Sequence, residues 1–314
     1  PPYARIFRIP PPAEPSAPER FARLHELPLE PVGAATGLKP KDIWASVREL
    51  LRHREMLDLL IRRDLKARYK DSALGFVWSL ARPLMQLVIY FVVVGQFLGA
   101  ARGIPDFAVY IFAGLTAMGL FTEILQGATG SILGNAGLVK KVYLPREVFP
   151  LASVGSALFN FTIQLAVLLG ATFLVGKPPL HTEILYFFPS LAVLVVYGTA
   201  FGLLFGALNV YLRDVQYLVE LGTMLLFWAS PIVYSWQMVA SLVKNPVVLE
   251  IYTNNPLTLA VIGFQHAFWV AGDDVPQPSD LLLRLSFALV IGVVVLFISH
   301  RAFLRLQGNF AQEL

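Results

Sequence analysis

Long apolar runs, separated by short charged or proline-containing segments, make up most of the sequence after residue 75. A helix rises about 1.5 Å per residue, so about 20 apolar residues cover the hydrocarbon core of a bilayer. The pattern therefore predicts an all-α integral membrane protein with about six transmembrane helices. The predicted spans are residues 76–97, 107–130, 148–175, 184–208, 221–238 and 281–299.

The positions of lysine and arginine orient these spans. Membrane proteins keep cation-rich loops on the cytoplasmic side, so the first span runs from inside to outside and both termini are cytoplasmic. The cations assigned to the inside are Arg62, Arg63, Lys66, Arg68, Lys70, Lys140, Lys141, Arg146, Arg213, Arg301 and Arg305. Those assigned to the outside are Arg102, Lys177, Lys244 and Arg284.

The apolar segment at residues 255–271 contains Gln265 and His266 near its middle. If it crossed the membrane, Arg301 and Arg305 would face the outside, against the charge rule. A re-entrant segment on the outer side, buried against protein, obeys the rule and tolerates the two polar side chains. We therefore predict a re-entrant helical segment between the fifth and sixth spans.

The N-terminal part is predicted to lie outside the bilayer core. Residues 1–40 are rich in proline, which predicts a disordered cytoplasmic arm, either a solvated tail or a docking segment. Residues 41–62 carry apolar positions at three- and four-residue spacing, with charges between them and Trp44 near the start. This pattern is typical of an amphipathic helix in the plane of the membrane, the alternative being a soluble helix packed on a partner.

Glycine and proline add two local predictions. Gly198, Gly202 and Gly206 repeat every four residues, which gives the fourth span a flat face for a neighbouring helix, in this chain or in a second copy. Pro231, inside the fifth span, predicts a kink or a break because proline cannot donate a backbone hydrogen bond.

Composition excludes several classes of function. Charged residues make up 15% of the chain, against about 25% in soluble domains. Cysteine is absent, which excludes disulfides and thiolate chemistry. The cations lie at the ends of apolar runs, so nucleic acid is not an expected partner. The sequence contains no GxxxxGK[ST], HExxH or GxSxG motif, so we predict no nucleotide-binding, metal-binding or catalytic residues in this chain.

The junction between the first cationic segment and the first span resembles a known family. It is similar to the opening motif of permease subunits of ABC type-2 exporters of lipid-linked polysaccharides, the O-antigen, capsule and teichoic acid group. The matching residues are Arg63, Tyr69, Ser72, Leu74, Gly75, Trp78 and Pro83, followed later by Arg213–Asp214, SPIVY at residues 230–234 and Asn-Pro-Leu at 255–257. The resemblance covers about residues 41–314, and the proline-rich arm departs from it in length.

This resemblance implies a channel-forming permease in the bacterial cytoplasmic membrane that moves a lipid-linked polysaccharide outward. The permease would be a homodimer bound to two cytoplasmic ATPase subunits. ATP and Mg²⁺ would bind to those partners, so this chain would hold no cofactor and would not be an enzyme.

The resemblance also places a coupling helix, which inserts into the ATPase, at residues 136–147. Its apolar part, from Ala136 to Leu144, is too short to span and is ended by Pro145; the alternative is a helix lying on lipid headgroups. The residues assigned to coupling are Asn135, Leu138, Lys140, Lys141, Leu144, Pro145, Arg146 and Glu147.

Aromatic side chains near the spans are candidates for lining a glycan path, because their faces stack on the C–H faces of sugars. The alternative is that they face lipid or form an interfacial belt. The candidates are Tyr90, Phe91, Phe121, Trp228, Tyr234 and Trp236. Glu123 is a carboxylate in the second span. It has either a functional role or a structural one, as half of a pair with another polar side chain.

Two other classes of function remain to be weighed. A polytopic membrane enzyme that transfers a glycan or lipid group would need carboxylates or histidines converging at one membrane face. An ion-coupled secondary carrier would need internal repeats with paired broken helices. The sequence shows one break, at Pro231, and no obvious second copy.

Overall fold

The structure is a computed structural model that describes residues 54–69, 77–97, 99, 103–141 and 145–314. Every regular element in these ranges is a helix, which confirms the predicted all-α class. Within these ranges four segments are long and apolar enough to cross a membrane, or five if the bent helix pair at residues 246–268 is one span, so the predicted number of about six stays a prediction. The four are α5 (Phe107–Gly134), α7 (Val148–Leu174), α8 (Phe187–Tyr211) with the preceding 3-10 helix η3 (Thr182–Tyr186), and α13 (Leu281–Leu306) with η5 (Gln307–Asn309).

The other described elements are shorter. They are α3 (Arg54–Tyr69), α4 (Val77–Ile89), the π-helical η1 (Tyr90–Phe97), α6 (Ala136–Lys141), α9 (Val215–Trp228), α10 (Trp236–Leu242), α11 (Pro246–Thr253), α12 (Pro256–Phe268), the 3-10 helix η4 (Val270–Gly272) and α14 (Phe310–Glu313).

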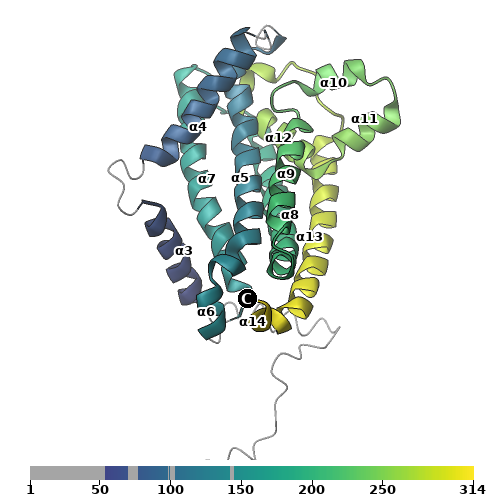
Figure 1. Cartoon of the computed structure of the whole chain (residues 1–314). Coiled ribbons are helices and arrows are strands. Elements are labelled where there is room, and N and C mark those ends of the chain that lie inside the picture. Colours follow the sequence, from purple (N-terminus) through teal and green to yellow (C-terminus); the bar gives the residue numbers. More distant parts are fainter. Residues whose placement is uncertain (1–53, 70–76, 98, 100–102, 142–144) are drawn as a thin grey trace, which may run out of the picture. The chain divides into compact units, whose positions relative to one another are not determined.

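Helix α5 lies at the centre of the bundle (Figure 1). It packs against α7, α8, α9 and α12, while α13 packs on the far side of α8. In its most apolar window 78% of α5 is buried inside the chain, against 22% for α13. Because α13 is strongly apolar yet little covered by protein, it is suited to contact lipid.

The glycine stripe of α8 faces α5. A Cβ added to Gly202 would lie 2.6 Å from Ala128 Cβ, and one added to Gly206 would lie 2.8 Å from the Ala128 carbonyl oxygen. The stripe therefore packs within this chain, which was one of its two predicted uses. One turn further on, Asn209 Nδ2 donates to the Thr129 carbonyl at 3.1 Å and extends the same contact.

Substitution of Gly206 tests this packing. Gly206→Ala should lower the stability of the protein by about 1–3 kcal/mol, since backbone atoms of α5 must move to admit the methyl group. Thermal unfolding of the detergent-purified protein measures this. Gly170→Ala is the matched control, because a Cβ there meets nothing within 4 Å. Equal melting temperatures for the two variants would contradict the assignment.

The fifth predicted span, residues 221–238, is wrong as a continuous helix. Helix α9 begins at Val215 and ends at Trp228, after which residues 229–235 form turns. The break that Pro231 predicts is therefore present. Sequence periodicity placed the span too late, because the apolar residues of the turns look like a continuation of the helix.

Buried side chains satisfy the backbone at this break. Gln265 Nε2 donates to the Pro231 carbonyl at 2.6 Å, and the Tyr110 hydroxyl lies 2.9 Å from the same oxygen and 2.8 Å from the Tyr234 carbonyl. Irregular backbone within a membrane bundle is stable only when protein groups replace the lost helical bonds. Gln265 thus explains a polar residue in the predicted re-entrant segment.

Replacing this donor should destabilise the bundle. Gln265→Leu is expected to cost about 1–3 kcal/mol, because Gln265 is buried and Pro231 loses a bonding partner. Gln237→Leu, a half-exposed position on α10, is the control for the change in polarity. Unfolding by heat in detergent again gives the readout, and a melting temperature for Gln265→Leu that matched the control would refute this role.

The predicted re-entrant segment, residues 255–271, corresponds to α12 and η4. Helix α12 is almost wholly buried and meets α11 at a bend of 73°. Arg284, at the start of α13, binds Glu250 on α11 at 2.6 Å. This ion pair places α11 beside the start of α13. A bent helix pair of this kind is either a broken span or a re-entrant segment, so the re-entrant segment stays a prediction.

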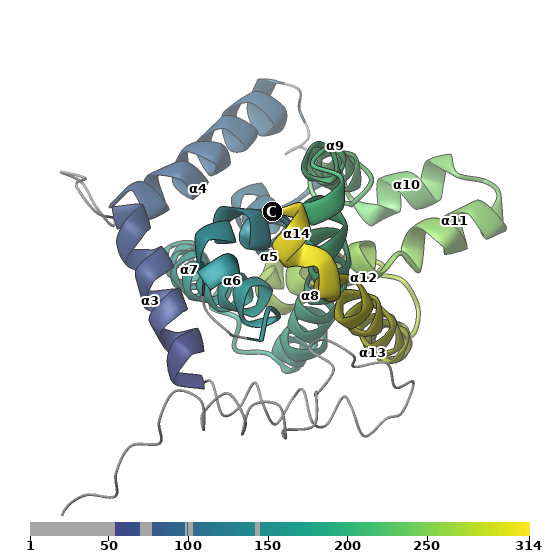
Figure 2. The same cartoon turned by 60° about the horizontal axis from the view of Figure 1, so that its bottom comes forward.

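The two ends of the bundle differ in charge. We call them the α6 end, which carries α6 and the C-terminus, and the α10 end, which carries α10 and α11 (Figures 1 and 2). Arg146 and Arg305, both assigned to the inside, lie at the α6 end. Lys177 and Arg284, assigned to the outside, lie at the α10 end and pair with Asp106 at 2.7 Å and Glu250 at 2.6 Å. The arrangement agrees with the predicted alternation.

The predicted in-plane helix, residues 41–62, is described only from Arg54, because residues 41–53 lie outside the described ranges together with the proline-rich arm. Helix α3 continues beyond Arg62 to Tyr69. It packs along α7, where Ile61 sits against Gly155 and Leu60 is buried. Its placement in the membrane plane stays a prediction.

Candidate functional site

Helix α6 projects at the α6 end from the turn that ends α5. It covers only residues 136–141 of the predicted coupling segment 136–147. Leu144 lies outside the described residues, and Pro145 to Glu147 lead into α7. Within α6, Val139 is buried, Leu138 is half-buried, and Lys140 and Lys141 are exposed. The helix thus has an anchored face and a cationic exposed face.

The anchored face belongs to a cluster that joins most helices at this end. We call it the α6-end cluster. Its buried apolar members are Leu60, Ile132, Val139, Val148, Phe149, Ala152, Leu203, Ala207, Val210, Phe303 and Phe310. These residues come from α3, α5, α6, α7, α8, α13 and α14, so a displacement of α6 must disturb several helices at once.

Asn135 links α6 to the N-terminal helix. Arg63 donates to Asn135 Oδ1 at 2.6 Å, and Asn135 Nδ2 donates to the Ser131 carbonyl at 2.8 Å. The sequence pointed to Arg63 and Asn135 separately. Nothing in it paired them, because they are 72 residues apart.

Arg146 and Glu147, both assigned to coupling, contact the protein instead of forming an exposed surface. Glu147 is buried, and its Oε1 lies 3.2 Å from His300 Nε2 on α13. The Arg146 guanidinium lies 5.7 Å from the ring centre of Phe310 in α14. These contacts hold the start of α7 to the last helices of the chain. Among the described residues of the segment 136–147, Lys140 and Lys141 have exposed side chains, with the half-buried Leu138 beside them.

Three of the six aromatic candidates lie together near the end of α9. The ring of Tyr90 is 5.8 Å from that of Phe227, which is 5.4 Å from Trp228. The Tyr234 hydroxyl donates to the Trp228 carbonyl at 2.7 Å. Phe227, which sequence reasoning missed, connects the group. No feature of the sequence separates Phe227 from the other apolar residues of α9, so its place in the group could not be predicted.

The other three candidates lie apart from this group. Phe121 is 4% exposed in the core between α5 and α8, so it is a packing residue in this chain. Trp236 donates from Nε1 to Thr253 Oγ1 at 2.9 Å and holds α10 to α11. Phe91 follows Tyr90 on η1 and is exposed.

Glu123 has a polar partner on a neighbouring helix. Asn160 Nδ2, on α7, donates to Glu123 Oε1 at 2.5 Å. One turn along α5, Gln126 Nε2 donates to Thr223 Oγ1 on α9 at 2.9 Å. Both α5 side chains are half-buried, so α5 carries polar groups toward α7 and α9. The structure therefore gives Glu123 a hydrogen-bond partner, Asn160, as the structural alternative predicted.

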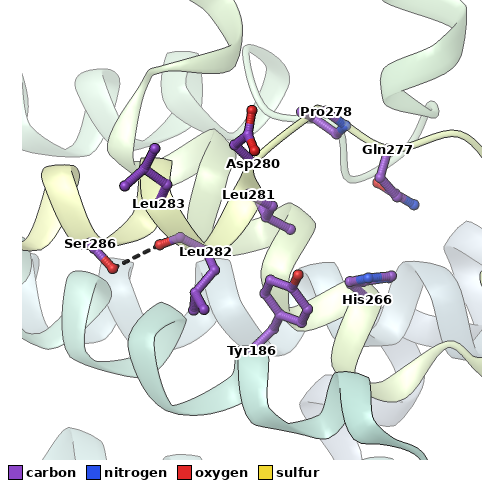
Figure 3. A pocket seen from close by; sticks show the side chains of 9 residues that line it. All are labelled: Tyr186, His266, Gln277, Pro278, Asp280, Leu281, Leu282, Leu283 and Ser286. Atoms are coloured by element: carbon purple, nitrogen blue, oxygen red, sulfur yellow. Dashed lines mark hydrogen bonds between the residues drawn. The ribbon is translucent and has the colours of Figure 1, made fainter.

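An open depression of about 560 Å³ lies at the α10 end (Figure 3). Its lining residues are Tyr186, His266, Gln277, Pro278, Asp280, Leu281, Leu282, Leu283 and Ser286. The rings of Tyr186 and His266 are 4.8 Å apart. The depression is polar at one side and apolar along the first turn of α13. Its lining is therefore amphiphilic.

A model of the "ABC-2 type transporter" family matches residues 56–269, more than half of the chain. The chain belongs to this family. The match confirms the resemblance seen in the sequence. This ABC-2 chain is a multi-pass membrane component of a transporter, a role that is not enzymatic.

Individual relatives of the ABC-2 chain include permeases named for O-antigen export. It is 27% identical to the O-antigen export system permease protein RfbA of Klebsiella pneumoniae over 83% of this chain and 95% of that protein. It is 29% identical to RfbA of Myxococcus xanthus over 81% and 96%. It is 24% identical to the polysialic acid transport protein KpsM of Escherichia coli over 61% and 76%.

Proposed function

We propose that this chain is the permease of an ATP-driven exporter that carries a lipid-linked polysaccharide across the bacterial inner membrane. Its family, and the export and transport functions for which its relatives are named, support the polysaccharide substrate and the outward direction of transport. The observation that carries the proposal is α6, a short helix with exposed lysines that is anchored in the α6-end cluster.

Energy for transport would come from a separate chain. The sequence has no phosphate-binding loop, so a cytoplasmic ATPase subunit would hold ATP and Mg²⁺. Lys140 and Lys141 would meet acidic groups of that subunit, and Val139 would pass its motion to α5, α7 and α13. The C-terminus would then be cytoplasmic, since the α6 end carries it. The cytoplasmic N-terminus rests on the charge rule alone.

Helix α9 supports assembly as a homodimer. Tyr217, Leu221, Met224 and Trp228 are 52–71% exposed along one face, and Glu220 lies exposed on the same face. A carboxylate within an apolar face is costly against lipid but suited to a partner chain or a water-filled path. The aromatic group of Tyr90, Phe227, Trp228 and Tyr234 lies at the end of this face. In the dimer these aromatic rings would stack on sugar rings as the polysaccharide passes.

Charge reversal on α6 tests coupling. In Lys140→Glu/Lys141→Glu, binding of the ATPase subunit should weaken by about tenfold, because exposed cations are replaced by anions without disturbing Val139. Co-purification and a binding titration in detergent measure this. Lys244→Glu, at the α10 end, is the matched control. If the double variant bound the ATPase as tightly as Lys244→Glu does, α6 would not be the docking element.

Truncation of the aromatic group tests the path. Trp228→Ala and Tyr90→Ala should reduce polysaccharide export severalfold while the ATPase still co-purifies, because the stacking surface is removed far from α6. Surface polysaccharide in cells dependent on the variant gives the readout. Phe173→Ala is the control, since Phe173 is 62% exposed at the end of α7. Full export in both aromatic variants would refute this part of the proposal.

A further inference from the structure

Three potential metal ligands meet at the α10 end, at the opposite end of the bundle from α6. His181 Nδ1 lies 2.8 Å from Glu183 Oε2 and 3.6 Å from Asp273 Oδ2. The three ligand atoms all lie within 4.8 Å of one another. His181 and Glu183 belong to the connection from α7 to α8, whereas Asp273 follows η4 in the connection from α12 to α13. The sequence predicted no metal site, because Asp273 is 90 residues beyond Glu183 and the three residues match no motif.

The far nitrogen of His181 contacts a backbone carbonyl. Nε2 lies 3.2 Å from the carbonyl oxygen of Ala267. A carbonyl can only accept, so Nε2 donates in this contact, and Nδ1 is the nitrogen that faces the two carboxylates. Histidines that bind metals have this arrangement, with the second nitrogen donating to a backbone carbonyl.

The distances and donor types fit zinc. In a tetrahedral site with bonds near 2.1 Å, ligand atoms lie about 3.4 Å apart. The Nδ1–Asp273 distance of 3.6 Å already matches, and Glu183 need withdraw by only about 0.6 Å. The Glu183 and Asp273 side chains are 33% and 39% exposed, so they can adjust and leave a fourth position to water. One imidazole with two carboxylates suits Zn²⁺, whereas Ca²⁺ and Mg²⁺ take oxygen ligands.

The geometry points to a Zn²⁺ site formed by His181, Glu183 and Asp273 that joins the α7–α8 and α12–α13 connections. The Thr182 hydroxyl donates to Glu183 Oε2 at 3.0 Å and orients that ligand from outside the site. Element η3 also carries Tyr186, one wall of the depression at the α10 end. The bound ion therefore fixes the position of that wall against α12.

Zinc titration of the full-length protein tests the site. The protein is purified in detergent through a tag without histidines, stripped with a chelator and titrated with ZnCl₂. One zinc per chain should remain after desalting, as measured by elemental analysis. The melting temperature should rise by about 5 °C at a hundredfold excess over Kd, because the ion binds only the folded chain. CaCl₂ and MgCl₂ at equal concentration should give no rise.

Variants separate a metal from a proton between the same groups. Asp273→Asn, at an exposed position that tolerates the change, should lower zinc affinity at least tenfold, and His181→Ala should abolish retention. Asp274→Asn, the exposed neighbour, should bind like the parent. If the parent retained no zinc and its melting temperature did not respond, an imidazolium ion pair would occupy the cluster and the proposal would be overturned. Neither readout depends on export or ATPase binding, so it stands or falls separately from the proposed function.

Discussion

The close approach of α5 and α8 is the constraint on which the remaining arrangement depends. At Gly202 and Gly206 no side chain separates the two helices, and Ala128 fills the gap. The opposite side of α8 is equally tight, since a Cβ at Gly292 of α13 would lie 2.6 Å from the Tyr197 ring. These contacts make α5, α8 and α13 a stack that cannot slide without steric clash. In a transport cycle these three helices must therefore move as one body, and relative motion falls to the helices around them.

The surrounding helices carry the groups to which we assign function. Helices α3 and α6 contact the stack at the α6 end through Leu60 and Val139, and α4, η1 and α9 lie along α5 with much of their surface exposed. A rigid centre with α6 at one end and an exposed flank agrees with the proposed ATPase docking and the proposed second copy. The α10 end is held by separate means, namely the ion pairs of Lys177 and Arg284 and the histidine cluster.

Hydropathy and charge placed the long helices well because burying a span in lipid leaves a signal in every residue. The sequence-based predictions failed where the structure depends on contacts between residues that are distant in sequence. The turns after Trp228 are as apolar as a helix, and Gln265, distant in sequence, satisfies their backbone. The sequence does not distinguish Phe121 from the other aromatic residues of the spans, but in the structure it is buried against α8. The pairing of Arg63 with Asn135 and of His181 with Asp273 depends on connections meeting in space, which one sequence does not reveal.

Phe310, five residues from the C-terminus, is fully buried against Phe303 and beneath Arg146. Residues 310–313 thus pack between α6 and the central stack, held by Tyr211 through the Leu306 carbonyl at 2.6 Å. A bulky group joined directly to Leu314 would press on this packing, and through it on the position of α6.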